Sequence, residues 1–477
     1  MNILFVASEC APFIKTGGLA DVIGAVPKAL KPLGANVRIL LPAYSALAGE
    51  VAKGTEVLTL PDLHGGPARV VAVSARGLDL LLLDAPHLFD RTGNIYLGPD
   101  GNDWHDNALR FGALSQVGAQ IAMGALGDWK PDLVNAHDWQ AALVPAYLRA
   151  AGSTVPSVMT IHNIAFQGLF DPGILGPLGL PGDMYSVDRG EYYGHFSFLK
   201  TGLMLADNIT TVSPTYAREL LTPEFGMGLD GVMQARRTDL TGIVNGIDLD
   251  VWNPETDAAI PAPYSAKTLK RKAQNKAALE ARFGVNPGDG PLFCVISRLT
   301  TQKGLDLLLD ILPGFVERGA RLALLGSGAR EMEQAYADAA RRYAGRVGVI
   351  IGYDENLSHL MQAGADAILI PSRFEPCGLT QLYGLRYGTI PVVARTGGLA
   401  DTVIDANLAA LDADCATGVQ FTPVTAMGLD QAVARTCELF SQPKIWAGMQ
   451  RRAMRQSVGW DASARSYLTL FQSLTEG

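Results

Sequence analysis

The chain has 477 residues and a formal charge of −8, with 48% hydrophobic and 18% charged residues. These values indicate a globular protein of two or three domains and exclude a wholly disordered chain or a coiled coil. The acidic balance argues against a general nucleic-acid binder, because such proteins usually present a basic face. Five widely spaced cysteines without a Cys-x-x-Cys pair favour neither a disulfide framework nor a cysteine-based zinc site.

The N-terminal sequence MNILFVASEC lacks a basic segment and reaches Glu9 after a short apolar run. It therefore predicts a buried strand rather than a signal peptide. No run of about 18 apolar residues occurs, so no transmembrane helix is expected. We expect a cytoplasmic protein that works in a reducing compartment without a membrane partner.

Short apolar runs alternate with helical patterns through the first half, which is typical of parallel sheets covered on both faces. Three runs between residues 57 and 84 have no helices between them and predict a small antiparallel patch. The expected strands span 2–8, 36–41, 57–60, 69–75, 78–84, 132–136, 157–161, 209–212 and 242–244. The expected helices include 19–33, 104–126 and one between strands 132–136 and 157–161.

A proline-rich stretch without periodicity, 248–266, predicts a linker and a domain boundary. A basic helix is expected at 267–283 and a helical tail at 426–474. Further strands, each followed by a helical pattern, are expected at 292–296, 321–325, 347–351, 367–370 and 391–394. The fold class is therefore α/β, with one Rossmann-like doubly wound domain at 1–247 and another at 248–456. We expect the tail helix 457–477 to join the first domain.

Two such domains facing each other predict a ligand cleft at the carboxyl ends of both sheets. An internal repeat supports this prediction: the sequence TGGLAD occurs at 16–21 and again at 396–401. Glycines let the backbone approach a ligand, and a helix N-terminus offers N–H groups to an anion. The alternative is a helix-start turn that is used twice for packing only.

Candidate phosphate-binding cations flank the expected glycine loops. Lys15 directly precedes the first TGGLAD copy, and a cation beside a glycine-rich helix start suits a phosphate. Arg298 and Lys303 lie in one loop after the strand 292–296, so we expect them to converge on one group. Together they would stabilise the charge on a leaving diphosphate without a metal. The alternative is a surface loop with ordinary charges.

A second candidate loop, EPCGLT, follows the strand 367–370. Glu375 is placed to face a reacting sugar, and Gly378, Leu379 and Thr380 begin a helix whose N–H groups suit phosphate. Cys377 has no neighbouring base motif, so we interpret its side chain as loop packing rather than as a nucleophile.

Polar residues end two strands of the first domain. His137 and Asp138 follow one strand, and His162 and Asn163 follow the next. At the carboxyl edge of a sheet such groups can bind sugar hydroxyls. A lone histidine is more often structural, and of these two His162 is the better functional candidate.

Other site classes are poorly supported. Gly326-Ser327-Gly328 lacks the third glycine of a dinucleotide-binding motif. Two Asp-x-Asp pairs lie in linker or turn sequence, and the seven histidines do not cluster at metal spacing. We therefore expect no bound metal and no cofactor.

Taken together, these motifs resemble those of bacterial glycogen synthases and the related starch synthases. The resemblance rests on KTGGLADV, HDW, IHN, VNGID, SRLTTQKG, PSRFEPCGLTQLYGLRYG and TGGLADTV, in this order along the whole chain. It implies a GT-B architecture, with the acceptor glucan bound on the N-terminal side and the nucleotide-sugar on the C-terminal side. It also implies glucosyl transfer from ADP-glucose to the nonreducing end of an α-1,4-glucan, with retention of configuration and release of ADP, in glycogen biosynthesis.

The resemblance also implies residue roles. It makes Arg298, Lys303, Glu375 and His162 the candidate catalytic residues, the two cations neutralising the leaving diphosphate. Lys15 and the glycine loop would approach the donor, with Asp21 supporting the loop, and Tyr353 would stack on adenine. The implied substrate-binding residues are Lys15, Gly17, Gly18, Asp21, Asp138, Asn163, Asn245, Tyr353, Cys377, Gly378, Leu379 and Thr380.

One departure concerns the wider retaining superfamily, in which Glu-x7-Glu is common. The second position of that motif is Tyr383 here, so a mechanism with two carboxylates at this loop is in doubt. Three alternatives stay open: a GT-B transferase that uses a UDP-sugar, a nicotinamide oxidoreductase, and a non-catalytic two-domain sugar-binding protein.

Overall fold

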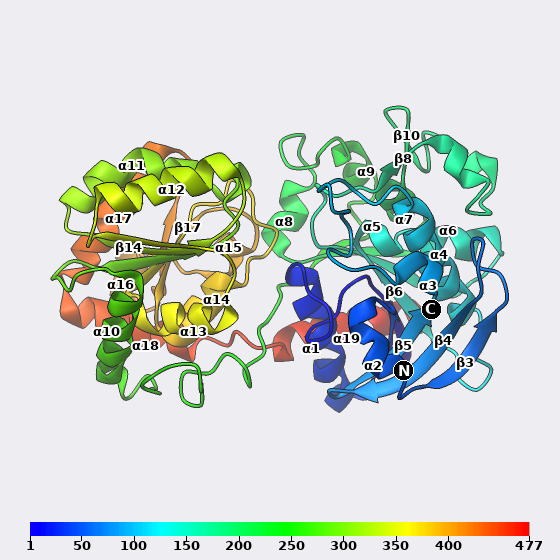
Figure 1. Cartoon of the computed structure of the whole chain (residues 1–477), viewed down its shortest axis with the longest axis horizontal. Coiled ribbons are helices and arrows are strands. Elements are labelled where there is room, and N and C mark those ends of the chain that lie inside the picture. Colours follow the sequence, from blue (N-terminus) through cyan, green and yellow to red (C-terminus); the bar gives the residue numbers. More distant parts are fainter. Residues whose placement is uncertain (477) are drawn as a thin grey trace. The chain divides into compact units, whose positions relative to one another are not determined.

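The computed structural model describes residues 1–476 and divides into two α/β units, drawn in Figure 1. Unit 1 consists of Met1–Asn245 and the tail from Trp460, and unit 2 of Gly246–Gly459. Each unit is built on a predominantly parallel sheet with helices between its strands, as the sequence predicted. None of the helices in 1–476 is both long and apolar enough to cross a membrane.

Unit 1 contains a nine-stranded sheet in the order β12-β11-β7-β6-β1-β2-β5-β4-β3. Its central strands are parallel and almost fully buried, whereas β3, β4 and β5 pair antiparallel at one edge. The predicted antiparallel patch is thus confirmed as one edge of the main sheet. The strands are β1 (Asn2–Val6), β2 (Asn36–Pro42), β3 (Thr55–Leu60), β4 (Ala68–Ala75), β5 (Leu78–Asp84), β6 (Leu133–His137), β7 (Ser157–Ile161), β11 (Asn208–Thr211) and β12 (Leu240–Gly242).

Ten α-helices accompany this sheet within the described residues. They are α1 (Gly18–Leu30), α2 (Ala48–Val51), α3 (Pro86–Phe89), α4 (Asn107–Ala122), α5 (Asp138–Ala141), α6 (Val144–Ala150), α7 (Phe198–Leu205), α8 (Pro214–Glu219), α9 (Asp230–Ala235) and α19 (Asp461–Thr475). The tail helix α19 packs in unit 1, where Phe471 lies edge-on to Phe5 and the Ser463 hydroxyl bonds the Val244 carbonyl.

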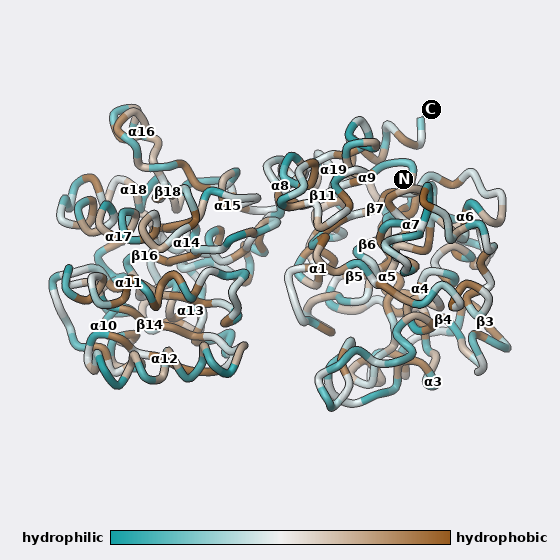
Figure 2. Tube along the Cα trace, turned by 90° about the horizontal axis from the view of Figure 1, so that it is seen from above, coloured by the Kyte–Doolittle hydropathy of each residue, from teal (hydrophilic) through white to brown (hydrophobic). Residues whose placement is uncertain are grey.

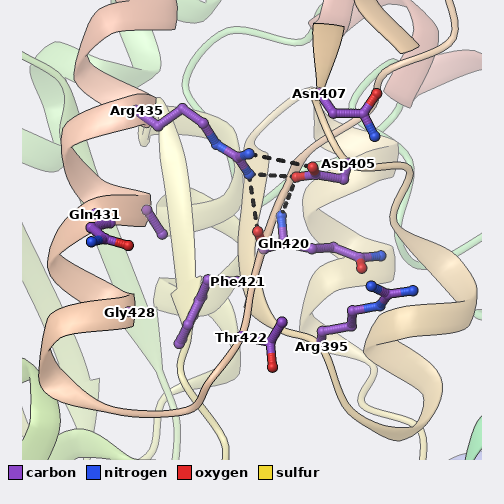
Figure 3. Close-up of a pocket in the computed structure, with 10 residues that line it drawn as sticks. Arg395, Asp405, Asn407, Gln420, Phe421, Thr422, Gly428, Gln431 and Arg435 are labelled. Atoms are coloured by element: carbon purple, nitrogen blue, oxygen red, sulfur yellow. Dashed lines mark hydrogen bonds and ion pairs between the residues drawn. The ribbon is translucent and has the colours of Figure 1, made fainter. Parts of the chain in front are cut away.

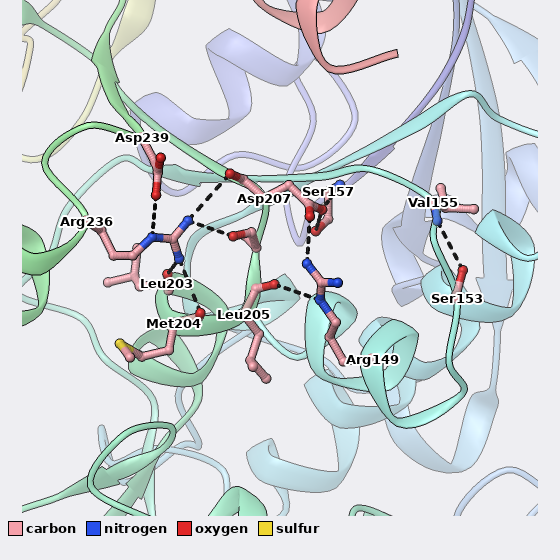
Figure 4. Close-up of polar contacts among 11 residues, drawn as sticks. Arg149, Ser153, Val155, Ser157, Leu203, Met204, Leu205, Asp207, Arg236 and Asp239 are labelled. Atoms are coloured by element: carbon pink, nitrogen blue, oxygen red, sulfur yellow. Dashed lines mark hydrogen bonds and ion pairs between the residues drawn. The ribbon is translucent and has the colours of Figure 1, made fainter. Parts of the chain in front are cut away.

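Arginines hold the C-terminal end of α7 (Figure 4). The Arg236 guanidinium donates to the carbonyls of Leu203 (2.6 Å) and Ala206 (2.8 Å), and Arg149 donates to that of Leu205. The last carbonyls of a helix lack internal partners, and cations there also interact favourably with the helix dipole. Arg149, which lies on α6, additionally pairs with Asp207, the residue that precedes β11.

The sequence prediction was wrong in two places of unit 1. The expected strand at 242–244 lies two residues earlier, as β12. A small sheet of β8 (Leu169–Phe170), β10 (His195–Ser197) and β9 (Glu191–Tyr192) was not predicted at all. Strands of two or three residues are too short to show the period-2 pattern by which strands are recognised.

Unit 2 contains a six-stranded parallel sheet in the order β15-β14-β13-β16-β17-β18. Its strands are β13 (Leu292–Ile296), β14 (Arg321–Gly326), β15 (Val347–Ile351), β16 (Ala367–Ile370), β17 (Ile390–Ala394) and the unpredicted edge strand β18 (Val419–Phe421). Its α-helices are α10 (Lys272–Phe283), α11 (Leu305–Glu317), α12 (Arg330–Arg342), α13 (Glu355–Gly364), α14 (Thr380–Tyr387), α15 (Gly397–Thr402), α16 (Leu408–Asp412), α17 (Ala426–Phe440) and α18 (Pro443–Arg455). Surface helices such as α12 alternate between hydrophilic and hydrophobic residues (Figure 2), because one face packs on the sheet.

The predicted linker has no helix or strand between 248 and 266, but it packs firmly on unit 2. The Trp252 ring is stacked between His359 of α13 (centroids 3.9 Å apart) and Tyr383 of α14 (3.7 Å). Asp257 accepts hydrogen bonds from Tyr387 and from His359, at 2.5 and 2.8 Å. Tyr383, which stands at the second position of the Glu-x7-Glu motif, thus holds the linker through its contact with Trp252.

Candidate functional site

The first glycine loop connects β1 to α1 and is exposed from Lys15 to Gly18. Lys15 Nζ lies 2.8 Å from the Asp21 carboxylate, across the start of the helix. A Cβ atom added to Gly17 would meet no atom within 4 Å, so the loop leaves open space above it. The predicted residues Lys15, Gly17, Gly18 and Asp21 are therefore brought together on one exposed turn.

A buried carboxylate that the sequence analysis did not select holds this loop. Glu9, which follows β1, accepts hydrogen bonds from the Thr16 N–H (2.5 Å), the Thr16 hydroxyl (2.5 Å) and the Gly17 N–H (3.1 Å). The Tyr96 hydroxyl donates to the same carboxylate at 2.6 Å. An acid directly after a buried strand was the available signal for Glu9. Tyr96 lies in a stretch without regular structure and gave none.

Glu9 changes what the first loop can bind. We expected its N–H groups to face an anion, but those of Thr16 and Gly17 are already bonded to Glu9. In a trans peptide the C=O of one residue points opposite to the N–H of the next, so the Lys15 and Thr16 carbonyls point away from Glu9. At Lys15 and Thr16 the loop therefore presents hydrogen-bond acceptors, which suit sugar hydroxyls better than phosphate.

The ends of β6 and β7 bring four predicted polar residues together, because these strands are parallel neighbours in the sheet. His137 Nδ1 and His162 Nε2 are 3.0 Å apart. The Asp138 carboxylate accepts the N–H of His162 at 2.7 Å and that of Asn163 at 3.4 Å. Asp138 has a φ of +54°, a strained conformation of a kind that clusters at functional sites.

Burial dominates the electrostatics of this cluster. It lowers the pKa of His162 to about 3 and keeps that of His137 well below its usual range, so both rings are neutral at pH 7. Burial raises the pKa of Asp138 to about 7, against the two N–H groups that lower it, and the Glu9 charge raises it further. His162 can thus donate or accept a hydrogen bond near neutral pH, but it supplies no positive charge.

Asn245 is the last residue of unit 1. Its side chain is buried, and its Oδ1 atom has no hydrogen-bond partner within residues 1–476. Since buried polar atoms are normally bonded, this unpaired acceptor is a candidate contact for a ligand hydroxyl.

In unit 2, Lys303 and Glu375 form an ion pair, with Lys303 Nζ 2.5 Å from Glu375 Oε2. Lys303 ends a short 3-10 turn after β13, and Glu375 lies after β16. These strands are sheet neighbours, which is why residues 72 positions apart meet. The Ser372 hydroxyl donates to the same carboxylate oxygen at 2.9 Å, and both partners of the ion pair are largely buried.

Arg298 follows β13 and is exposed. Within residues 1–476 its guanidinium has no hydrogen-bond or ion-pair partner. The expected convergence of Arg298 and Lys303 on one group therefore stays a prediction.

The remaining predicted residues of unit 2 lie at two other strand ends. Tyr353 follows β15; its side chain is 72% exposed and its hydroxyl donates to Glu355. Cys377 is buried, as expected for loop packing, and Gly378 has a φ of +72°. The loop leads into Thr380, the first residue of α14.

Comparisons with known proteins agree with this arrangement. The family model "Starch synthase catalytic domain" matches residues 2–235, and "Glycosyl transferases group 1" matches residues 279–440. Glycogen synthase of Roseobacter denitrificans is 64% identical over 100% of both chains, and glycogen synthase 1 of Rhizobium meliloti is 56% identical over 99% of both. The chain belongs to the glycogen synthase family. The family resemblance, the fold class and the glycosyltransferase assignment are thereby confirmed.

Solved structures place this family member in the GT-B fold. The catalytic domain of starch synthase IV from Arabidopsis thaliana, bound to ADP and acarbose, has a TM-score of 0.88 and 29% identity, covering 100% of this chain and 99% of that one. Sucrose-phosphate synthase from Thermosynechococcus elongatus, with a TM-score of 0.60 and 16% identity over 100% and 99% of the two chains, shares the fold.

Unit 2 of this glycogen synthase family member also contains a pocket of about 450 Å³ after β17 and β18 (Figure 3). Arg435 on its wall donates to Asp405 (2.5 Å) and to the Gln420 carbonyl (3.0 Å), so these groups largely satisfy one another. The pocket contains none of the predicted site residues. Among residues 1–476, no group of three or more His, Cys, Asp or Glu side chains is placed to hold a metal ion.

Proposed function

We propose that this chain transfers glucose from ADP-glucose to the nonreducing end of an α-1,4-glucan, with retention of configuration and release of ADP, in glycogen biosynthesis. The names of the full-length relatives support the reaction, and the ADP and acarbose bound to the plant starch synthase support the donor and acceptor classes. A cytoplasmic location and the absence of a metal requirement belong to the same proposal.

The Lys303–Glu375 ion pair is the observation that carries the proposal. It places a cation and a carboxylate at the carboxyl end of a parallel sheet, beside the start of α14. Lys303, with Arg298, would neutralise the leaving diphosphate. Glu375, whose Oε2 atom is held by Lys303 and Ser372, would contact the donor sugar.

In this proposal the first glycine loop and the loops of unit 2 bind different parts of the substrates. The first presents carbonyls and a buried carboxylate, so it would bind glucose or acceptor hydroxyls together with Asp138, His162 and Asn163. Unit 2 supplies the cations for the diphosphate and Tyr353 for the adenine. We propose that both sets act on one substrate.

Retention would follow from attack on the face from which the diphosphate leaves. The bond between glucose C1 and the phosphate oxygen breaks, C1 bonds to the acceptor hydroxyl oxygen, and the hydroxyl proton passes to the departing phosphate. Double displacement would need a carboxylate nucleophile, but the second position of the superfamily motif holds Tyr383, stacked on Trp252. A trapped glucosyl-enzyme would contradict this route.

The deciding experiment incubates the full chain with glycogen and either ADP-glucose or UDP-glucose, and measures the released nucleotide with and without EDTA. We expect ADP release with glucan elongation that EDTA does not reduce. Preferential UDP release would make the chain a UDP-sugar transferase, and absence of turnover with both donors would overturn the proposal.

A further inference from the structure

Gln381, in the first turn of α14, clamps the backbone of the preceding loop. Its side chain is fully buried, and Nε2 donates to the carbonyls of Cys377 and Gly378, each at 3.0 Å. A third contact at 3.3 Å joins Nε2 to Thr402 Oγ1 at the end of α15. One amide group thus holds two successive carbonyls of the loop that the Lys303–Glu375 pair adjoins.

Because the peptide units are planar and trans, the two bonded carbonyls also fix the direction of two N–H groups. The peptide units after Cys377 and Gly378 are trans, so each N–H points opposite to the carbonyl before it. Because both carbonyls face Gln381, the N–H groups of Gly378 and Leu379 face away from it. Within residues 1–476 neither N–H has a hydrogen-bond partner.

The arrangement of the Gln381 side chain leaves its own oxygen atom without a partner. Gln381 Oε1 is buried and, within residues 1–476, has no hydrogen-bond partner. A Cβ atom at position 378 would lie 2.5 Å from this oxygen, and the φ of +72° there also requires glycine. A buried unpaired acceptor costs stability, so a side chain that serves packing alone would be better apolar.

We propose that Gln381 is a positioning residue that orients the Gly378 and Leu379 N–H groups toward the diphosphate of ADP-glucose. The inference rests on the proposed function. Gln381 itself contacts no substrate, and it acts only through the two peptide units that it fixes.

The test compares Gln381→Met, which keeps the length of the side chain without its donors, with Gln450→Met. The Gln450 amide bonds the Gly388 carbonyl at the opposite end of α14, so it matches the chemistry but lies away from the loop. For Gln381→Met we expect a 10- to 100-fold rise in the KM for ADP-glucose and in the Kd for ADP, an order of magnitude typical of lost hydrogen bonds to a charged group. The KM for glycogen should change less than about threefold, and Gln450→Met should leave all three constants unchanged.

An unchanged KM for ADP-glucose in folded Gln381→Met would overturn the inference, as would an equal rise in both KM values. If Gln381→Met does not fold, Gln381→Glu replaces it in the same measurements, since the ionised carboxylate keeps the size but cannot donate. A wild-type chain without ADP-glucose turnover would instead count against the proposed function. The two failures are therefore distinguishable.

Discussion

The two TGGLAD copies have the same six residues but opposite environments. In the first copy Gly17 is exposed and extended, with a φ of −156° and open space where a Cβ would be. In the second copy Gly397 has a φ of +44°, and a Cβ there would lie 1.9 Å from the Glu375 carbonyl oxygen. The first copy is therefore an exposed turn, and the second is a packing element behind the Glu375 loop.

The difference teaches that a glycine-rich helix start need not be an anion site. In the first copy the N–H groups of Thr16 and Gly17 are bonded to Glu9, and in the second the Gly398 N–H donates to the carbonyls of Glu375 and Pro376. Within residues 1–476 the N–H groups of Gly378 and Leu379, in a third loop, have no hydrogen-bond partner. For the second copy the packing alternative therefore describes the structure better.

The largest expected effect is the difference in activity loss between substitution of Lys303 and substitution of Lys15. Lys303→Ala should lower kcat by about 100-fold or more, because it removes charge stabilisation of the leaving diphosphate in a largely buried site. Lys15→Ala should cost only about 10-fold, since Lys15 is exposed and already paired with Asp21. Steady-state kinetics with ADP-glucose and glycogen measure both.

Lys276→Met on α10, which removes an ion pair with Asp366, serves as the control for loss of a lysine in unit 2. Near wild-type turnover in Lys303→Ala would contradict the assignment of the diphosphate to unit 2.

Replacing one glycine of each copy by alanine tests whether the second copy is packed and the first is exposed. Gly397→Ala should reduce the free energy of unfolding by about 3 kcal/mol or more, because it combines a left-handed φ with a clash against backbone. Gly17→Ala should change it by less than about 0.5 kcal/mol while lowering kcat/KM, because its methyl group enters space meant for substrate. Thermal unfolding measures the stability of both variants, and steady-state kinetics measure their kcat/KM. An equal loss of stability in the two variants would contradict the different environments assigned to the two copies.

Glu9→Gln tests whether the carboxylate fixes the first loop. The amide can accept two of the four hydrogen bonds but cannot match the charge-assisted contacts to Thr16, Gly17 and Tyr96. We expect a fall of about 10-fold in kcat/KM for glycogen with an unchanged Kd for ADP. A weakened ADP affinity with intact glycogen kinetics would reverse the roles given to the two loops.

Much of this site could be predicted because it lies at strand ends. The apolar runs that define β6, β7, β13 and β16 also place Asp138, His162, Lys303 and Glu375 at carboxyl edges. The groups that orient the backbone were not predictable in this way. Glu9 and Gln381 act on loop N–H and carbonyl groups whose directions depend on φ and ψ, and sequence periodicity carries no signal for those angles. The edge strand β18 was missed for a related reason, since three residues with a central Gln420 show no strand pattern.

The smallest effect concerns the pH dependence that burial imposes on Asp138. Its pKa of about 7 in the folded chain exceeds the ordinary aspartate value of 3.8, so between these pH values the folded state binds more protons than the unfolded state. The stabilising contribution of this group is thus lost as pH rises toward 7. Asp138→Asn removes the titration and tolerates the left-handed φ, so its Tm should exceed that of wild type by about 2 °C at pH 8 and by less at pH 5.

The titration of Asp138 should affect activity in the opposite direction, so that kcat/KM rises with pH where stability falls. If ionised Asp138 accepts a sugar hydroxyl, wild-type kcat/KM rises with a midpoint near pH 7, in surroundings where Glu9 is the nearby charge and His137 and His162 are neutral. Asp138→Asn should be slower and lack this limb, whereas exposed Asp183→Asn should keep it. An unchanged limb in Asp138→Asn would assign the titration to another group.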